Sequence, residues 1–127
     1  AIAITGDTSK TDYIRYLHMI RNEETIFVYL TPEKIVGSDH LKQVLLDIHE
    51  REHKITRFAV DEAHCVSQWG HDFRPQYTEL SSVKHSFPGV PVMALTATAT
   101  PAVKKDIISS LCITGSWLSP HLTTFLF

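Results

Sequence analysis

The sequence predicts an α/β fold in which a parallel sheet carries helices on both of its faces. Four short runs rich in apolar and β-branched residues, each followed by an amphipathic segment, lie at residues 2–5, 26–30, 58–60 and 92–95. Strands that alternate with helices in this way form right-handed βαβ units and therefore a parallel sheet. Ligands bind at the carboxyl ends of the strands in such a sheet, so functional residues are expected there.

Capping residues and apolar spacing predict where the helices lie. Ser9, Ser38 and Thr100 stand at the expected N-caps of three helices. The second helix has the clearest spacing of apolar residues, with one face formed by Leu41, Val44, Leu45 and Ile48. A weaker helix is predicted over residues 77–87, and Pro88 follows its end. The pattern loses its periodicity after residue 113.

Composition excludes several classes of protein. The 127 residues are 43% hydrophobic and 20% charged, which is typical of a globular domain. A formal net charge of −2 gives no general attraction to nucleic acid, so any contact with it must be local. Cys65 and Cys112 lack the spacing of a disulfide framework or a zinc site and favour a reducing compartment. The apolar start ends at Gly6, too early for a membrane span.

Two acidic residues, Asp61 and Glu62, directly follow the predicted strand at residues 58–60. At this position a carboxylate can hold Mg²⁺ against phosphate groups while a second one activates the attacking water, as phosphoryl transfer requires. Taken alone, such a pair more often caps a turn. The residues around the pair therefore decide its interpretation.

A second pattern, at residues 49–53, has the sequence His-Glu-Arg-Glu-His, which matches two zinc-protease signatures. Histidines four residues apart share a helix face and can bind zinc. The run is, however, the polar end of an amphipathic helix, and no later segment supplies a third ligand. We therefore predict a solvated helix end and no zinc site.

Four segments resemble motifs of one helicase family. The run Asp-Glu-Ala-His at residues 61–64 resembles the second motif of DEAH-type superfamily 2 helicases, and residues 65–75 resemble the aromatic-rich loop of RecQ-family DNA helicases. Residues 30–33 are similar to that family's motif Ib and residues 94–99 to its motif III, in the family's order. The sequence is thus identified as similar to RecQ helicases, nearest to the eukaryotic Bloom-syndrome-type subgroup.

The resemblance implies catalytic roles for residues at the nucleotide site. Asp61 would hold Mg²⁺ through water, Glu62 would activate the hydrolytic water, and His64 would link the nucleotide site to motif III. Thr96 and Thr98, in motif III, would extend hydroxyl groups towards the carboxylate motif and so couple motif III to the nucleotide site. Without the resemblance, these threonines would be ordinary strand-end residues.

The resemblance also implies DNA-binding residues. Trp69 and Phe73 would stack on unpaired bases, Arg74 would offer a charge to phosphate or to a neighbouring motif, and Gln68 would lie with them in an exposed loop. Thr31 would donate its hydroxyl to a DNA phosphate. The alternatives are core aromatic residues at Trp69 and Phe73, and a helix N-cap at Thr31.

Parts of the family's motor are missing from this sequence. Residues 1–113 are expected to form a partial first RecA-like domain with motif Ib, motif II, the aromatic-rich loop and motif III, and residues 114–127 a divergent tail. No G-x-x-x-x-G-K-[ST] phosphate loop occurs, and neither does the family's second motor domain or zinc-binding region. We therefore expect an incomplete sheet with an unpaired edge, marginal stability and no activity of this segment alone.

The expected function of the parent is that of an ATP-dependent 3′–5′ DNA helicase in nuclear DNA repair and recombination. Its cofactors would be ATP and Mg²⁺, its partners single-stranded and branched DNA, and it would have no membrane contact. One alternative is a truncated, non-hydrolysing chain that binds single-stranded DNA or a protein partner. Another is an RNA helicase or a different DEAH-type motor, against which the loop at residues 69–74 argues.

Overall fold

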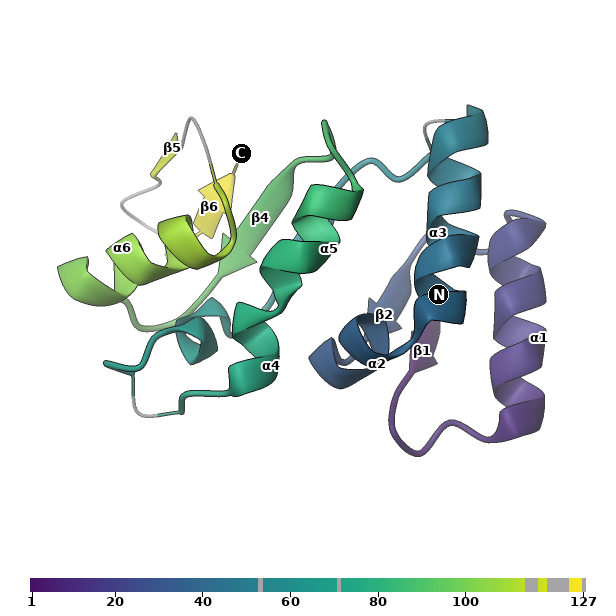
Figure 1. Ribbon diagram of the computed structural model, residues 1–127, viewed down its shortest axis with the longest axis horizontal. Helices are drawn as coiled ribbons and strands as arrows, with labels where there is room; N and C mark the ends of the chain where they lie inside the picture. The colour runs from purple at the N-terminus through teal and green to yellow at the C-terminus, as the bar shows by residue number, and fades with distance from the viewer. Residues whose placement is uncertain (53, 71, 114–116, 119–123, 127) are drawn as a thin grey trace. The chain divides into compact units, whose positions relative to one another are not determined.

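The computed structural model describes residues 1–52, 54–70, 72–113, 117–118 and 124–126. The chain divides into two compact units, Ala1–Ile55 and Thr56–Phe127 (Figure 1). Helices and strands alternate along both units. The predicted α/β class is therefore confirmed, and each unit is described below by itself.

The first unit contains one pair of parallel strands and three helices. Ile2 of the first strand is in register with Val28 of the second. Its elements in chain order are β1 (Ile2–Ile4), α1 (Lys10–Arg21), β2 (Val28–Leu30), α2 (Pro32–Gly37) and α3 (Asp39–Glu52). Buried aliphatic side chains from β1, α1 and α3 form the core of this unit. They include Ile4, Leu17, Ile20, Leu41 and Val44.

Side-chain caps fix the starts of the two longer helices of this unit, as predicted. The Ser9 hydroxyl accepts a hydrogen bond from the backbone N–H of Asp12 at 3.0 Å. The Ser38 hydroxyl accepts one from the N–H of Leu41 at 3.2 Å, and it also lies 3.0 Å from the Tyr13 hydroxyl. These bonds satisfy N–H groups that have no partner inside the helix.

The second unit contains a parallel strand pair extended by two antiparallel strands. Phe58 pairs with Val92 in the parallel pair, and the sheet order is β3-β4-β6-β5. The elements are β3 (Phe58–Val60), a 3₁₀ helix η1 (Ala63–Val66), α4 (Pro75–Thr78), α5 (Leu80–Ser86), β4 (Val92–Leu95), α6 (Pro101–Ser110), β5 (Trp117–Leu118) and β6 (Thr124–Leu126).

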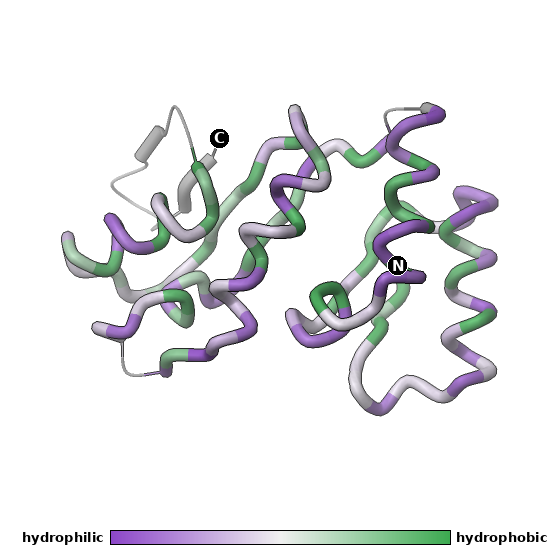
Figure 2. The backbone as a smooth tube through the Cα atoms, viewed as in Figure 1, coloured by the Kyte–Doolittle hydropathy of each residue, from purple (hydrophilic) through white to green (hydrophobic). Residues whose placement is uncertain are grey.

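The core of the second unit lies between strand β4, helix α6 and the 3₁₀ helix η1. It is built from Ala63, Val66, Val92, Ala94, Val103, Ile107, Leu111 and Ile113. The strands are mostly hydrophobic, whereas hydrophilic and hydrophobic residues alternate along the helices (Figure 2). Phe87 is fully buried and meets Phe58 edge to face, with ring centroids 5.2 Å apart. The contact between these two rings lies at the amino end of β3, and the parallel register then places the carboxyl ends of the two strands side by side, with Val60 opposite Ala94.

The four predicted strands form two separate parallel pairs rather than one sheet. Within the described residues, no hydrogen-bonded ladder joins β1 and β2 to β3 and β4. In the RecA-like fold the phosphate-loop strand lies inside the sheet, and this sequence contains no such strand.

The predicted helix at residues 77–87 is observed as two helices, α4 and α5, which meet at Glu79. The pattern that led to this prediction was weak, and the chain begins to turn into α4 earlier than expected, at Pro75.

Candidate functional site

The carboxylate motif lies in a sharp turn at the carboxyl end of β3. Glu62 adopts a left-handed backbone conformation with φ +50°, which costs a residue with a side chain about 1 kcal/mol or more. The Asp61 carboxylate accepts a hydrogen bond from the N–H of Glu62 at 2.9 Å, and the Glu62 carbonyl accepts one from Cys65. Both acidic side chains are exposed. The turn thus presents two carboxylates to solvent at the strand edge.

His64 connects this motif to the segment that follows β4. Its Nδ1 lies 2.9 Å from the Thr96 hydroxyl and 3.3 Å from a carboxylate oxygen of Glu62. The Thr96 hydroxyl donates its single hydrogen to the carbonyl of Thr98 at 3.0 Å. It can therefore only accept from His64, which assigns the proton of the neutral imidazole to Nδ1. His64 thereby donates towards Thr96 and Glu62 together.

The aromatic-rich loop follows the carboxylate motif directly. Trp69 is 80% exposed, so the alternative that it is a core aromatic residue is wrong. Phe73 is 37% exposed, and Gln68 and Arg74 are exposed as well. An indole held out in solvent has no packing role in this unit and presents a free face for stacking.

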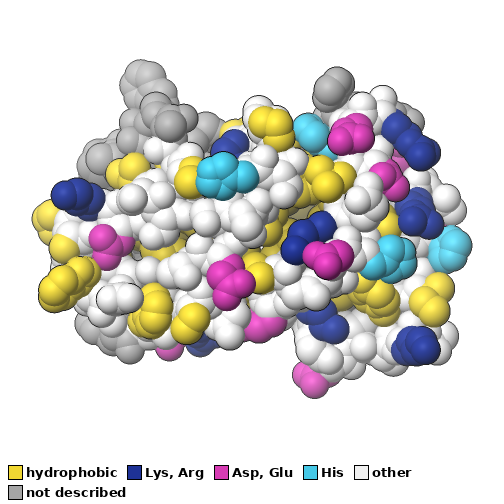
Figure 3. Space-filling model, viewed as in Figure 1, with side chains coloured by type: hydrophobic (Ala, Val, Ile, Leu, Met, Phe, Trp, Pro, Cys, Tyr) yellow, Lys and Arg dark blue, Asp and Glu magenta, His cyan; other side chains and the backbone are white. Residues whose placement is uncertain are grey.

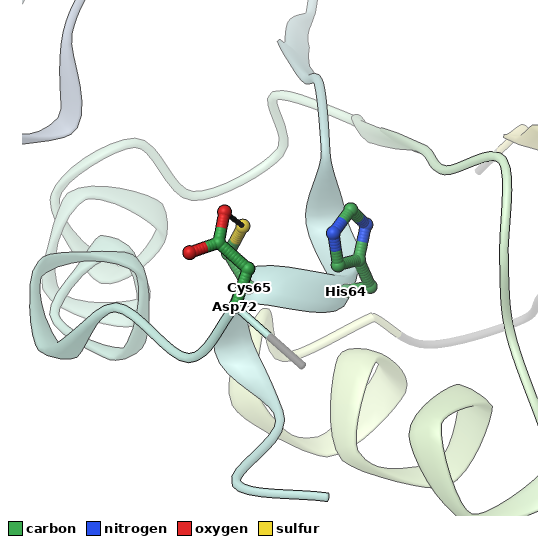
Figure 4. A group of neighbouring side chains, drawn as sticks. All are labelled: His64, Cys65 and Asp72. Atoms are coloured by element: carbon green, nitrogen blue, oxygen red, sulfur yellow. Dashed lines mark hydrogen bonds between the residues drawn. The ribbon is translucent and has the colours of Figure 1, made fainter. Parts of the chain in front are cut away.

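Polar contacts at the far end of the loop hold it against η1. The Arg74 guanidinium donates to the Asp72 carboxylate at 3.0 Å, and this hydrogen bond raises the pKa of Arg74. The Cys65 thiol lies 3.9 Å from the same carboxylate (Figure 4). Burial raises the pKa of this thiol, and the negative charge of Asp72 adds to the effect.

The atoms of His64, Cys65 and Asp72 could in principle hold a metal ion, since one donor from each lies within 4.8 Å of the others. Nitrogen, sulfur and oxygen donors together suit zinc. Each group already has a protein partner, however, and the raised thiol pKa opposes the thiolate that a metal requires. We therefore assign these contacts to the structure of the loop.

The hard oxygen donors that Mg²⁺ prefers belong to Asp61 and Glu62. Asp61 lies directly at the strand end, and it is exposed, as a residue that contacts the ion through water must be. The residues present thus fit the expected ion.

Two predicted site residues, Thr98 and Thr31, make no side-chain hydrogen bond to the carboxylate motif within the described residues. Thr98 is exposed, and its hydroxyl makes no hydrogen bond to the carboxylate motif within the part of the chain that the structure describes. Thr31 lies in the first unit, at the N-cap position of α2, where its side chain makes no capping hydrogen bond. Its hydroxyl is therefore available, and the predicted role of each threonine stays a prediction.

The zinc-protease pattern at residues 49–53 cannot be tested as a whole against the structure, because His53 lies outside the described residues.

A surface hollow of about 490 Å³ contains no predicted site residue. It is lined by Arg21, Asn22, Glu23, Asp47, Ile48 and Arg51. Acidic and basic side chains are interspersed on the face drawn in Figure 3. No helix among the described residues combines the length and the apolar character needed to cross a membrane.

Sequence reasoning did not single out Ser67 and Asp106. Ser67 is fully buried, and its hydroxyl donates to the Asp106 carboxylate on α6 at 2.6 Å. The two residues are 39 positions apart, and no sequence signal connects them.

Comparison with known proteins agrees with the motifs. Residues 1–107 match the model of the DEAD/DEAH box helicase family. The RecQ-like DNA helicase BLM of Xenopus laevis is 43% identical over 100% of the chain, and the RecQ-like DNA helicase blm-1 of Caenorhabditis elegans is 50% identical over 76%. The ATP-dependent DNA helicase Q1 of Mus musculus is 40% identical over 91% of the chain. The chain covers 9%, 10% and 19% of these relatives, respectively.

The chain therefore belongs to the DEAD/DEAH box helicases. Within that family it belongs to the RecQ branch, and the predicted resemblance to Bloom-syndrome-type helicases is confirmed.

Proposed function

We propose that this chain is the hydrolytic and DNA-sensing part of an ATP-dependent DNA helicase that moves 3′ to 5′ and acts in nuclear DNA repair and recombination. One observation carries the proposal. The exposed carboxylates of Asp61 and Glu62 and the exposed indole of Trp69 stand at the two ends of the short helix η1. Hydrolysis and DNA contact would thus share one short segment of the chain.

In the hydrolytic half of this proposal, Asp61 would hold Mg²⁺ through water, and a bound ion would supply positive charge against the phosphates of ATP. Glu62 orients the attacking water and takes up its proton. His64, which donates from Nδ1 towards Glu62 and Thr96, holds that carboxylate in place and relates its position to the segment after β4. Thr98 would also extend its hydroxyl towards the carboxylate motif and take part in this coupling.

In the DNA half, Trp69 and Phe73 stack on unpaired bases of single-stranded or branched DNA, and Gln68 and Arg74 contact its backbone. Thr31, which lies in the first unit, donates its hydroxyl to a DNA phosphate. Stacking on an exposed aromatic ring is worth about 1–3 kcal/mol per base and tolerates any sequence, as a translocating motor requires.

Hydrolysis by the 127-residue segment alone is not expected. The sequence has no phosphate loop to hold the β- and γ-phosphates of ATP. The segment alone would therefore bind single-stranded DNA without hydrolysing ATP, which is the second candidate function; the exposed Trp69 favours it for the isolated chain.

Binding and unwinding together test the proposal. Trp69→Ala should weaken binding of fluorescent single-stranded DNA roughly tenfold or more. Tyr29→Ala, which removes an aromatic residue that is 64% exposed in the first unit, is the matched control. The full-length protein should unwind a duplex with a 3′ single-stranded tail and not one with a 5′ tail. Preference for RNA, or equal effects of the two substitutions, would contradict the proposal.

A further inference from the structure

Ser67 is the one fully buried polar side chain of the aromatic-rich loop within the described residues. Its hydroxyl donates to the Asp106 carboxylate at 2.6 Å, a length typical of a strong hydrogen bond to a charged acceptor. The same oxygen accepts the backbone N–H of Trp69 at 3.2 Å. A continuous chain of hydrogen bonds therefore runs from the backbone of the exposed tryptophan to helix α6.

The backbone of the loop is also tightly packed at Gly70, directly after Trp69. The N–H of Gly70 donates to the carbonyl of Ser67 at 3.1 Å. A Cβ atom at Gly70 would lie 3.1 Å from the carbonyl oxygen of His64 and 3.3 Å from that of Ser67, both backbone atoms. The backbone on both sides of Trp69 is thus held against η1.

A second hydrogen bond joins η1 to the segment between β4 and α6. His64, at the start of η1, bonds to Thr96 after β4, while Ser67, at the end of η1, bonds to Asp106 on α6. One contact lies beside the carboxylate motif and the other beneath the loop. Movement of the loop on DNA would therefore act on one end of η1 at Ser67 and reach the carboxylate motif at the other end through His64.

We propose that Asp106 is a positioning residue for DNA-stimulated ATP hydrolysis: it holds Ser67, and through Ser67 it sets the aromatic-rich loop so that DNA binding reaches the carboxylates. Asp106 contacts neither nucleotide nor DNA in this role. The inference rests on the proposed function, because it assigns a task in that reaction.

The test uses the full-length protein and measures ATP hydrolysis at increasing concentrations of single-stranded DNA. Asp106→Asn, which keeps the shape of the side chain and removes its charge, should raise the DNA concentration for half-maximal stimulation roughly tenfold. Basal hydrolysis without DNA should stay within about twofold of wild type. Ser109→Ala, an exposed site on the same helix, is the control and should change neither quantity.

A double variant that combines Asp106→Asn with Ser67→Ala distinguishes the loss of this one hydrogen bond from a general loss of structure. If the two residues act through one hydrogen bond, the double variant should be no worse than the more impaired single variant. Unchanged stimulation in Asp106→Asn, additive losses, or an equal loss of basal and stimulated rates would overturn the inference. A wild-type protein without any DNA-stimulated hydrolysis would instead refute the proposed function.

Discussion

The hydrogen bond between His64 and Thr96 joins two motifs that are 32 residues apart in the chain. The resemblance to helicases predicted that both residues belong to the site, because their motifs could be recognised. It did not predict that Thr96 is buried and that its hydroxyl bonds to both His64 and Thr98, nor that Ser67 bonds to Asp106. Contacts of that kind depend on how elements pack, and no local spacing encodes them.

Thr96→Val should destabilise the chain by about 1 kcal/mol, because the Nδ1 of the partly buried His64 loses its nearer acceptor and keeps only the Glu62 carboxylate at 3.3 Å. Thr98→Val is the matched control; its side chain is exposed, so its cost should stay within about 0.5 kcal/mol. Urea denaturation of each variant measures the difference. Equal losses would show that the hydroxyl of Thr96 contributes nothing beyond its packing.

The Cys65 thiol should make stability depend on pH in the alkaline range. Burial raises its pKa above the ordinary value of 9.0, whereas the unfolded chain ionises near that value. The unfolded state then binds fewer protons, so the free energy of unfolding should fall as the pH rises above 9.0. Cys65→Ala should remove part of this fall, with Cys112→Ala as the control for the loss of a thiol. Identical pH profiles for all three proteins would contradict this.

Helix boundaries were predicted best where a side chain caps the helix. Ser9, Ser38 and Thr100 all occupy their expected positions and accept backbone hydrogen bonds. The predicted helix at residues 77–87 was partly right, because the stretch is helical but is divided at Glu79. Serine and threonine side chains around the division bond to nearby carbonyl groups, as Ser82 does to Glu79 at 2.7 Å. Such bonds compete with a continuous helix, and composition alone does not show which conformation wins.

The caps allow a paired prediction for helices that both start with threonine and proline. Thr100→Ala should cost about 1 kcal/mol, because the hydroxyl accepts the N–H of Val103 at 3.3 Å. Thr31→Ala should cost only a few tenths of a kcal/mol, because no capping bond is present there. Denaturation curves compare the two directly. A larger loss at Thr31 than at Thr100 would show that the caps are assigned wrongly.

Across the whole molecule, the α/β class and the site motifs followed from the sequence, whereas the division into two units did not. Strands of three or four residues give too weak a signal to reveal which of them pair. Among its described residues the first unit has two strands, and large apolar side chains are exposed at and just before β2, namely Ile26, Phe27 and Tyr29. An exposed apolar edge of this kind is open to further pairing.

The isolated 127-residue chain should therefore be marginally stable. We expect a free energy of unfolding below about 5 kcal/mol by urea denaturation, with self-association at higher protein concentration. Analytical ultracentrifugation at several concentrations monitors the second effect. A monomer that unfolds in one cooperative transition with the stability of a complete domain would contradict the incomplete sheet.

The measurement that tests the central claim most directly is the rate of ATP hydrolysis by the full-length protein, with and without single-stranded DNA, compared with Glu62→Gln. Glu79→Gln, an exposed glutamate at the junction of α4 and α5, is the control. We predict hydrolysis that DNA stimulates, a loss of roughly a hundredfold or more in Glu62→Gln, and no change in the control. Hydrolysis at the wild-type rate in Glu62→Gln would contradict the assignment of the catalytic carboxylates.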